Sequence, residues 1–268
     1  MANRRVALVG CGMVGMSYAY ALLNSDLCNE LILIDINEEK ALGEAMDLNH
    51  GLCFSSSHMK IRAGSFEDCQ YADLVVITAS AGSRKPGQTR LDLLQKNVGV
   101  FKSFISKIVA SGFNGIFLVA SNPVDVMTRL TYELSGFPAN RVIGSGTTLD
   151  TARLRYLIGD YFQADPHSVH GYVIGEHGDS EFVPFSQLNL STKNVEEFFS
   201  DERFKDEYKR EDIEQIIEKV KTSGAEVIKL KGATYYGIGM SLVRITKAIF
   251  GDENSVITVS SRLNGEYG

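Results

Sequence analysis

The sequence predicts a doubly wound parallel α/β sheet followed by a smaller α+β domain. Two observations predict this fold class. Short apolar runs alternate with longer helical segments along the first half of the chain, which is typical of repeated β-α-β units. A glycine-rich turn, Gly10-Cys11-Gly12-Met13-Val14-Gly15, directly follows the first apolar run. We place the domain boundary after Gly144, so the expected ranges are 1–144 and 145–268.

The first β-α-β unit contains the most informative motif. The apolar run over 6–9 is short and continuous, as expected for a buried parallel strand, and it leads directly into the glycines. A helix over 14–23 and a second buried strand over 31–34 follow. That strand ends in Asp35, which lies 20 residues beyond Gly15. In this context a G-x-G-x-x-G sequence indicates a dinucleotide site.

This Rossmann-type arrangement predicts NAD as the cofactor. The glycines allow a tight turn and a close approach of the pyrophosphate to the helix N-terminus. Asp35 favours NAD over NADP, because a 2′-phosphate would meet a carboxylate instead of an arginine. The alternative is a tight β-α-β turn that binds no nucleotide. The expected cofactor-binding residues are Gly10, Gly12, Val14, Gly15, Asp35 and Asn122.

The next segments continue the alternation of strands and helices. Strands are expected over 59–63, 74–78 and 115–120, and helices over 38–49, 91–111 and 124–134. Ligands of such sheets bind beyond the C-terminal ends of the strands, so the loops 79–90 and 121–123 should line the cofactor crevice. The first loop is long and rich in Gly, Ser and cations, which predicts a lid. The alternative is a solvated surface loop.

The second half of the chain has a different character. Strands are expected over 169–174, 182–190 and 256–259, and helices over 225–230 and 238–250. The charged stretch 195–223 is interpreted as a solvated helix face. Asn264-Gly265 is a strong hairpin signal, yet no return strand follows it before Gly268. We therefore expect the chain to be truncated at its C-terminus.

Composition excludes several classes of function. A formal net charge of −6 argues against a nucleic-acid surface, which needs a basic face. Three glycines interrupt the apolar run over 6–23, so it is not expected to be a signal peptide or a membrane span. The four cysteines show no C-x-x-C spacing, which favours neither a metal site nor disulfides. A protein of the reducing cytoplasm is expected.

A histidine and an acidic helix start are the candidate catalytic residues. His177 lies in a Gly-rich loop, and Asp150 and Arg153 share one face of a probable first helical turn after Thr147 and Thr148, which are N-cap candidates. Asp150 could orient an imidazole, and Arg153 could bind a carboxylate with its bidentate fork. Acid/base chemistry on a small acid is one interpretation. The other is a salt-bridged helix start beside an unrelated histidine.

Taken together, these motifs resemble the L-lactate dehydrogenase family, which also includes L-2-hydroxyisocaproate dehydrogenases and is related to malate dehydrogenases. The resemblance covers Arg5 to Gly268. The matching motifs are Gly10-Cys11-Gly12-Met13-Val14-Gly15, Lys85-Pro86-Gly87-Gln88-Thr89-Arg90-Leu91-Asp92-Leu93, Ser121-Asn122-Pro123-Val124-Asp125, Leu149-Asp150-Thr151-Ala152-Arg153, Gly175-Glu176-His177-Gly178-Asp179 and Lys231-Gly232-Ala233-Thr234-Tyr235-Tyr236-Gly237.

The resemblance implies a role for each candidate. Protonated His177 would give its proton to the keto oxygen of pyruvate while NADH gives hydride to the carbon. Asp150 would orient His177, Arg153 would hold the substrate carboxylate, and Arg90 would polarise the carbonyl. Asn122 and Thr234 match positions near the substrate.

The resemblance also implies regulation and assembly. Arg155 and His170 match positions at which bacterial members bind fructose 1,6-bisphosphate between subunits, so a homotetramer is implied. Members of the family continue for some tens of residues past the position of Gly268.

Substrate choice is the point at which the family pattern divides. Arg84 stands where most lactate enzymes carry glutamine and where malate dehydrogenases carry arginine, and it is a candidate substrate-binding residue. Lactate is the expected substrate, and malate or L-2-hydroxyisocaproate are the alternatives. A protein that binds the dinucleotide but is catalytically inactive is the alternative outside enzymes.

Overall fold

A computed structural model describes residues 4–82 and 90–266, with the backbone alone for Arg90 and Leu91. The chain divides into two compact units. Unit 1 comprises Met1–Ser145 and Tyr235–Gly268, and unit 2 comprises Gly146–Thr234.

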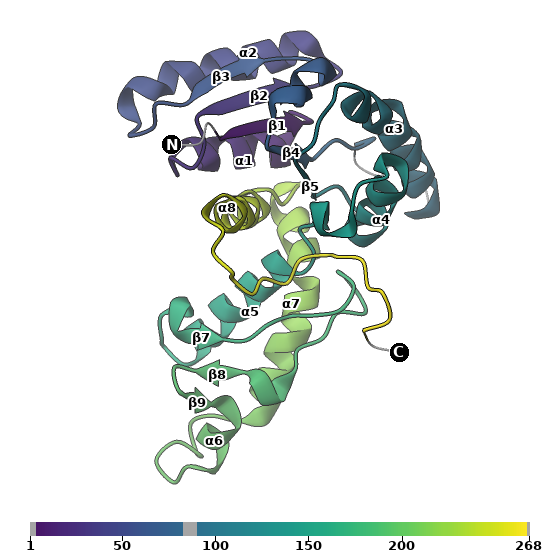
Figure 1. Cartoon of the computed structure of the whole chain (residues 1–268). Coiled ribbons are helices and arrows are strands. Elements are labelled where there is room, and N and C mark those ends of the chain that lie inside the picture. Colours follow the sequence, from purple (N-terminus) through teal and green to yellow (C-terminus); the bar gives the residue numbers. More distant parts are fainter. Residues whose placement is uncertain (1–3, 83–89, 267–268) are drawn as a thin grey trace. The chain divides into compact units, whose positions relative to one another are not determined.

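Unit 1 is built on a sheet of six strands in the order β3-β2-β1-β4-β5-β6 (Figure 1). All adjacent pairs in this sheet are parallel. The strands are β1 Arg5–Val9, β2 Glu30–Ile34, β3 Lys60–Ala63, β4 Leu74–Ile77, β5 Ile116–Val119 and β6 Val142–Gly144. The chain runs from β1 to one edge and then returns to β4 and runs to the other edge, so the direction of winding changes between β1 and β4. The predicted doubly wound α/β class is confirmed.

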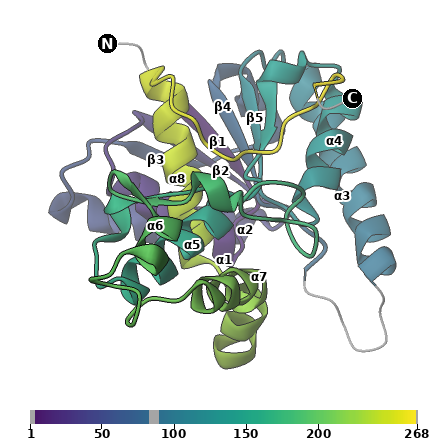
Figure 2. The same ribbon diagram turned by 90° about the horizontal axis from the view of Figure 1, so that it is seen from below.

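Helices cover both faces of this sheet. The helices of unit 1 are α1 Met13–Leu23, α2 Glu38–Gly51, α3 Arg90–Ala110, α4 Val124–Ser135 and α8 Tyr236–Gly251. Alternate residues of β1 enter opposite cores: Val6 and Leu8 pack with α1, α2 and α8, while Ala7 and Val9 pack with α3 and α4. Figure 2 shows α8 and the α3–α4 pair on opposite sides of the central strands. This alternation explains why the central strands β1, β4 and β5 are nearly continuous apolar runs, whereas the edge strand β3 includes Lys60 and Arg62.

The C-terminal helix α8 belongs to unit 1 because it packs closely on α1. A Cβ atom added at Gly239 would lie 2.9 Å from the backbone carbon of Ser17, so only glycine permits this approach. The fully buried Tyr18 hydroxyl lies 2.9 Å from the Thr246 Oγ1. The sequence predicted a second domain running from 145 to 268. In the structure, Tyr235–Gly268 groups with the six-stranded sheet of unit 1.

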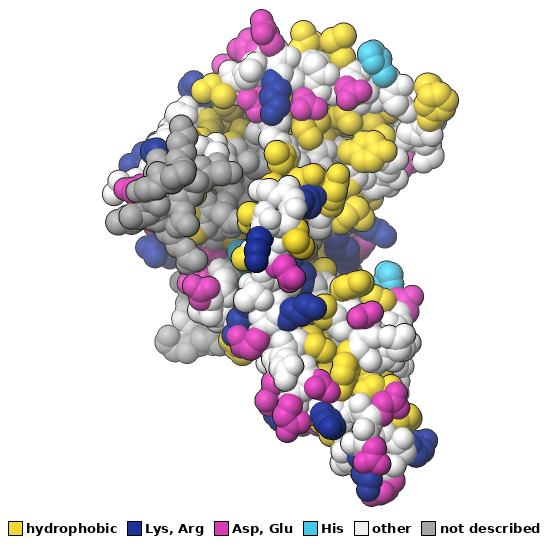
Figure 3. Space-filling model, turned by 180° about the vertical axis from the view of Figure 1, so that it is seen from behind, with side chains coloured by type: hydrophobic (Ala, Val, Ile, Leu, Met, Phe, Trp, Pro, Cys, Tyr) yellow, Lys and Arg dark blue, Asp and Glu magenta, His cyan; other side chains and the backbone are white. Residues whose placement is uncertain are grey.

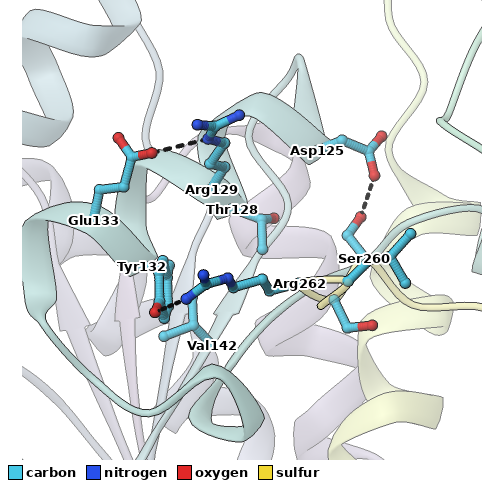
Figure 4. Close-up of a pocket in the computed structure, with 10 residues that line it drawn as sticks. Asp125, Thr128, Arg129, Tyr132, Glu133, Val142, Ser260 and Arg262 are labelled. Atoms are coloured by element: carbon cyan, nitrogen blue, oxygen red, sulfur yellow. Dashed lines mark hydrogen bonds and ion pairs between the residues drawn. The ribbon is translucent and has the colours of Figure 1, made fainter. Parts of the chain in front are cut away.

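The segment after α8 differs from the prediction. Residues 256–259 do not form the expected strand, and only Ser260 makes an isolated antiparallel bridge, with Gly144. Ser260 also donates a hydrogen bond of 2.7 Å to Asp125, and Arg262 donates to the Tyr132 hydroxyl (Figure 4). A cavity of about 510 Å³ lies between α4 and this tail. One backbone bridge and several side-chain contacts, instead of a continuous strand ladder, therefore attach the tail.

Unit 2 is smaller and has less regular structure. Its elements are α5 Thr148–Tyr161, β7 Val169–His170, β8 Asn189–Leu190, β9 Lys193–Asn194, α6 Val195–Ser200 and α7 Arg210–Lys231. The three strands form an antiparallel sheet. Its core joins α5, α7 and the chain that leads to the His177 loop, through Leu154, Ile158, Val173, Leu188, Ile213 and Val220.

Two predictions for unit 2 were wrong in extent. The expected strands 169–174 and 182–190 shorten to β7 and β8, with one isolated bridge between Ile174 and Phe182. The expected helix 225–230 is the end of α7, which continues back through the charged stretch. Short 3-10 turns complete the description of both units: Leu52–Phe54, Phe66–Tyr71, Ala139–Arg141, Pro166–Ser168 and Phe185–Gln187.

Several large apolar side chains are exposed on unit 1. Tyr20 on α1, Leu42 and Met46 on α2, and Phe54 just after α2 are all more than half exposed. Figure 3 shows hydrophobic side chains gathered on the unit 1 part of one face, whereas charged side chains dominate the unit 2 part. Among the residues that the structure describes, no helix combines the length and apolarity that a membrane span requires.

The packing of α1 on α8 predicts the effect of removing one buried hydroxyl. We expect Tyr18→Phe to lower the free energy of unfolding by about 1 kcal/mol, because the hydrogen bond to Thr246 is lost in a dry core. Thr246 keeps a hydrogen bond to the Leu242 carbonyl, so the loss should not be larger. Urea denaturation measures it. Tyr20→Phe, on the exposed side of the same helix, is the control and should change stability by less than about 0.5 kcal/mol; equal effects would contradict the packing described.

Candidate active site

His177 and Asp150 form a buried acid–base pair in unit 2. The His177 Nδ1 lies 2.7 Å from the Asp150 Oδ2, and the Asp150 side chain is only 1% exposed. The other carboxylate oxygen, Oδ1, accepts a 2.8 Å hydrogen bond from the Arg153 Nη1. The structure therefore brings together the three residues in which the sequence suggested acid/base chemistry.

Two threonines fix the start of α5 against the segment that precedes the histidine loop. The Thr147 Oγ1 donates a 2.6 Å hydrogen bond to the Val173 carbonyl, and the Val173 N–H donates to the Thr151 Oγ1 at 3.0 Å. Thr147 occupies the N-cap position of α5, as predicted, but its side chain makes no capping hydrogen bond. The predicted capping role was wrong because the hydroxyl bonds to the neighbouring segment instead.

The histidine loop is a sharp reversal of the chain. Gly175 and Gly178 have φ angles of +95° and +119°, which side-chain-bearing residues rarely adopt. Backbone hydrogen bonds of 2.9 Å between Ile174 and Phe182, in both directions, close the base of the loop. This reversal places Glu181 beside His177: Glu181 Oε2 accepts a hydrogen bond from the Gly178 N–H at 3.2 Å and lies 3.5 Å from the His177 Nδ1. Sequence reasoning missed Glu181.

The surrounding carboxylates favour the charged imidazolium. Hydrogen bonding to Asp150 and Glu181 raises the pKa of His177 to about 10, against the opposing effect of burial. Burial by itself would raise the pKa of Asp150, but the hydrogen bond from His177 and the charges of His177 and Arg153 hold it below its usual value. At neutral pH the pair is therefore an imidazolium beside a carboxylate, which is the state of a proton donor.

Arg153 lies between this pair and α7. Its side chain is 16% exposed, and a Cβ atom added at Gly224 would lie 3.4 Å from its Nη2. Glycine at this point of α7 thus leaves room for the guanidinium. A guanidinium carries five N–H donors, so the ion pair with Asp150 leaves it able to bind a second carboxylate.

The glycines of unit 1 have three different roles. Gly10 has a φ angle of +104°, and a Cβ atom there would lie 2.6 Å from the Ala79 nitrogen. A Cβ atom at Gly15 would collide with the Gly10 carbonyl oxygen and lie 2.7 Å from the Thr78 Oγ1. At Gly12 the same atom would meet nothing within 4 Å, so its absence is not needed for packing. Gly12 instead leaves open space at the N-terminus of α1.

Asp35 is held in place at the C-terminal end of β2. Its two carboxylate oxygens accept hydrogen bonds from the Cys11 N–H at 2.7 Å and from the Asn37 N–H at 3.0 Å. A cavity of about 480 Å³ opens beside it, lined by Gly10, Gly12, Asp35, Thr78, Val100 and Phe104 among others. A lining that combines glycine backbone, a carboxylate, lysines and apolar side chains suits a nucleoside with its phosphates. Val14 packs against the core instead of lining this cavity.

A buried asparagine that the sequence analysis missed joins two loops of unit 1. Asn97 on α3 is 1% exposed, its Nδ2 donates a 2.8 Å hydrogen bond to the Asn122 carbonyl, and its Oδ1 accepts one of 2.7 Å from the Ala81 N–H. The beginning of the 79–90 loop is thereby tied to the loop that carries Asn122. Helical spacing to the buried Phe101 and Phe104 was the signal that could have identified Asn97 as an inward-facing polar residue.

The remaining predicted substrate residues are described only in part. Arg84 lies outside the described residues. Arg90 is the first residue of α3, and its side chain is not described. Thr234 follows α7 and is half-buried.

The two predicted effector residues lie near each other within unit 2. Arg155 donates a hydrogen bond of 3.3 Å to the carbonyl of Gly171, the residue that follows His170. The Arg155 guanidinium also lies over the Tyr172 ring, 5.4 Å from its centroid. His170 is exposed at the end of β7.

Comparison with protein families gives two matches that together span almost the whole chain. The model of the lactate/malate dehydrogenase NAD binding domain matches residues 4–144. The model of the lactate/malate dehydrogenase alpha/beta C-terminal domain matches residues 147–268.

Individual relatives agree with the family matches. L-lactate dehydrogenase 2 of Bacillus cereus is 53% identical over 264 residues, which are 98% of this chain and 83% of the relative. L-lactate dehydrogenase of Bacillus pumilus is 50% identical over 98% of this chain and 82% of its own length. Among solved structures, a lactate dehydrogenase from a Medee basin deep-sea metagenome library has a TM-score of 0.95 and 52% identity, covering 100% of this chain and 84% of that one. The minor L-lactate dehydrogenase of Enterococcus mundtii in its ligands-bound form has a TM-score of 0.96 and 48% identity, with the same coverage.

The geometry of the buried pair predicts how His177 responds to loss of its partner. We expect Asp150→Asn to lower the pKa of His177 by more than about 1 pH unit, because a carboxylate within hydrogen-bond distance stabilises the imidazolium. An NMR titration of the imidazole measures the midpoint. Asp160→Asn, on the exposed last turn of the same helix, is the control and should leave the midpoint close to that of the parent. A midpoint that is the same in all three proteins would show that Asp150 does not hold the proton on His177.

Proposed function

Because the chain belongs to the lactate/malate dehydrogenase family, we propose that it is an NAD-dependent L-lactate dehydrogenase that interconverts pyruvate and L-lactate. The buried pair of Asp150 and His177, with Arg153 bound to the same carboxylate, is the observation that carries this proposal. His177 supplies a proton donor, and Arg153 supplies a binding group for a carboxylate close to it. A 2-keto acid is the small substrate that needs both.

His177 is the proposed proton donor of the reduction. Converting a keto group to a hydroxyl requires a hydride at carbon and a proton at oxygen, and NADH supplies the hydride when bound. Because the Nδ1 is held by Asp150, the proton passes from the Nε2 to the keto oxygen, and the neutral imidazole then takes it back in the oxidation of lactate. Asp150 keeps the ring oriented in both directions and stabilises its charged form.

Arginines are the proposed contacts to the substrate. Arg153 binds the carboxylate of the substrate through two parallel hydrogen bonds, which fixes the keto carbon relative to His177. Arg90 polarises the carbonyl, where negative charge develops during reduction. Asn122 and Thr234 are proposed as further substrate contacts.

The proposed residues for the cofactor lie at the C-terminal ends of β1 and β2. Gly10, Gly12 and Gly15 form the turn at the N-terminus of α1, and the open space at Gly12 permits close approach of a pyrophosphate. Asp35 receives the ribose hydroxyls. The 480 Å³ cavity beside these residues supports the assignment.

Pyruvate is the proposed keto acid in preference to oxaloacetate. The relatives that are 50–53% identical are named L-lactate dehydrogenases, although Arg84 is the residue found in malate enzymes. An arginine pairs best with a second carboxylate, which oxaloacetate has and pyruvate lacks, so this one position favours the malate alternative while the named relatives favour pyruvate. A malate enzyme or an L-2-hydroxyisocaproate enzyme is the alternative.

We also propose a cytoplasmic homotetramer activated by fructose 1,6-bisphosphate. The exposed Tyr20, Leu42, Met46 and Phe54 of unit 1 support contact between subunits. Arg155 beside the residue that follows His170 supports an anion site. Four cysteines without a disulfide fit a reducing compartment.

Activation that persists unchanged when Arg155 and His170 are both replaced by alanine would remove them from the effector site.

Turnover with a panel of 2-keto acids tests the proposed activity. We expect the purified chain to oxidise NADH with pyruvate and to reject oxaloacetate, as followed by absorbance of the reduced nicotinamide. His177→Asn should reduce kcat by about 10²–10⁴-fold, because the general acid is removed, while NADH affinity remains near that of the parent. His167→Asn, an exposed histidine of the same unit, is the matched control.

The outcomes separate the alternatives. Binding of NADH without turnover of any keto acid would indicate the inactive dinucleotide-binding protein. Faster turnover of oxaloacetate than of pyruvate would indicate a malate enzyme. Turnover by His177→Asn within threefold of the parent would show that another group supplies the proton.

A further inference from the structure

Glu181 is a second buried carboxylate beside His177, and neither the sequence motif nor the proposed reaction requires it. Its side chain is 2% exposed, and its Oε2 lies 3.5 Å from the His177 Nδ1. The same oxygen accepts a hydrogen bond from the Gly178 N–H at 3.2 Å, so it is fixed by the loop that carries the histidine. The imidazole nitrogen thus faces Asp150 from α5 and Glu181 from its own loop.

We propose that Glu181 is a positioning residue that, together with Asp150, keeps the imidazolium form of His177 ready to give its Nε2 proton to a 2-keto acid. This inference rests on the proposed function, in which His177 is the proton donor. Glu181 does not touch the substrate in this role. It acts through the charge on the ring.

The charges of the cluster carry the argument. The groups that face one another are Asp150 and Arg153 from α5 and His177 and Glu181 from the loop. Two carboxylates and one guanidinium give a net charge of −1 when the imidazole is neutral and 0 when it is protonated. A net charge on a buried cluster is costly, because water does not screen the repulsion between its like charges. With Glu181 present, the protonated ring is therefore the form that leaves the cluster neutral.

The distances identify a proton, and not a metal ion, as the cation that these groups share. Asp150, His177 and Glu181 present three potential ligand atoms within 4.8 Å of one another, a set that could in principle bind zinc. Two ligands of a tetrahedral zinc ion at 2.0–2.2 Å from it would lie about 3.4 Å apart. The His177 Nδ1 and the Asp150 Oδ2 lie 2.7 Å apart, which is the separation of a hydrogen bond with a proton between the atoms.

A functional consequence follows for the two directions of the reaction. Reduction of a keto acid uses the protonated ring, and oxidation of a hydroxy acid uses the neutral ring. Because the pKa of His177 is raised to about 10 in part by Glu181, removal of this carboxylate moves the loss of the proton to lower pH. Glu181 therefore extends the pH range of reduction upward at the expense of oxidation near neutral pH.

The decisive experiment is an NMR titration of His177 in the full chain, because it does not depend on turnover. We expect Glu181→Gln, which keeps the shape of the side chain, to lower the midpoint of the imidazole by about 1 pH unit or more. Glu181→Asp keeps the charge and should recover most of the parent midpoint. Glu176→Gln removes one negative charge from an exposed position next to His177 and should shift the midpoint by only a few tenths of a unit.

Each pattern of results decides the proposal. Two results would assign Glu181 to packing and overturn the proposal. One is a midpoint of His177 in Glu181→Gln equal to that in Glu176→Gln. The other is a midpoint that stays near the parent value in Glu181→Gln but falls in Glu181→Asp. If Glu181→Gln does not fold, the side-chain carboxyl ¹³C resonance of Glu181 in the parent gives the answer: its shift must change at the midpoint of His177, and a constant shift overturns the proposal.

Enzyme kinetics then separate this proposal from that of the activity itself. In an active enzyme, Glu181→Gln should lower kcat for reduction of pyruvate by about tenfold at a pH above its new midpoint and leave KM and NADH affinity nearly unchanged. If the parent turns over no keto acid, the proposed function fails. The titration still shows whether Glu181 holds the proton on His177.

Discussion

The buried ion pair between Asp150 and His177 is the interaction on which the candidate site depends. A carboxylate that is 1% exposed is strongly destabilised unless cations and hydrogen-bond donors compensate its charge. Arg153 and His177 both do so here, one at each oxygen. The local structure of unit 2 serves the same contact: α5 presents Asp150 and Arg153 from one face, Thr147 and Thr151 hold the adjacent segment, and the glycines of the loop allow the chain to turn back.

The carboxylates that bind His177 also set its protonation state, and therefore its ability to donate a proton. A histidine at its ordinary pKa near 6.5 would be mostly neutral at neutral pH and would be a poor acid for reduction. The carboxylates beside His177 raise its pKa to about 10, so the ring keeps its proton at neutral pH. In the proposed reaction, a substrate carboxylate bound at Arg153 would bring the keto oxygen within reach of this proton. Unit 1 contributes separately, through a cavity lined by Gly12 and Asp35 at the strand ends, which is the proposed site of the cofactor.

The correctly predicted elements of the fold are those whose local sequence pattern is compatible with only one type of secondary structure. Continuous apolar runs predicted the strands β1, β2, β4 and β5, because both faces of the sheet are buried there. The short edge strand β6 was not predicted. The expected strand 256–259 was wrong because only Ile257 and Val259 pack against the core, and the segment forms no ladder with a neighbouring strand. The expected strands 169–174 and 182–190 were too long, since the turn at Gly175 and Gly178 interrupts them. The packing of α8 on α1 depends on Gly239 in contact with a helix far away in the sequence.

For the catalytic cluster, helix periodicity predicted the pair on α5 but not the residue that the loop adds to it. Asp150 and Arg153 are three residues apart, so their common face followed directly. Glu181 is four residues after His177, but no helix joins them, and only the reversal of the loop brings their side chains together. The spacing along α3 shows that Asn97 faces inward. It does not reveal that this side chain joins the loops of Ala81 and Asn122.

Buried carboxylates hold the proton on His177 to a pH well above the ordinary pKa of a histidine. The pH dependence of kcat/KM for reduction of pyruvate tests it most directly, because this parameter reports the ionisation of the free enzyme. A raised pKa means that the active, protonated form persists as pH rises and is lost only as pH passes the raised value. We therefore predict a plateau that extends through pH 8 and falls toward pH 10. A fall centred at about pH 6.5, the value of an unperturbed histidine, would contradict the account.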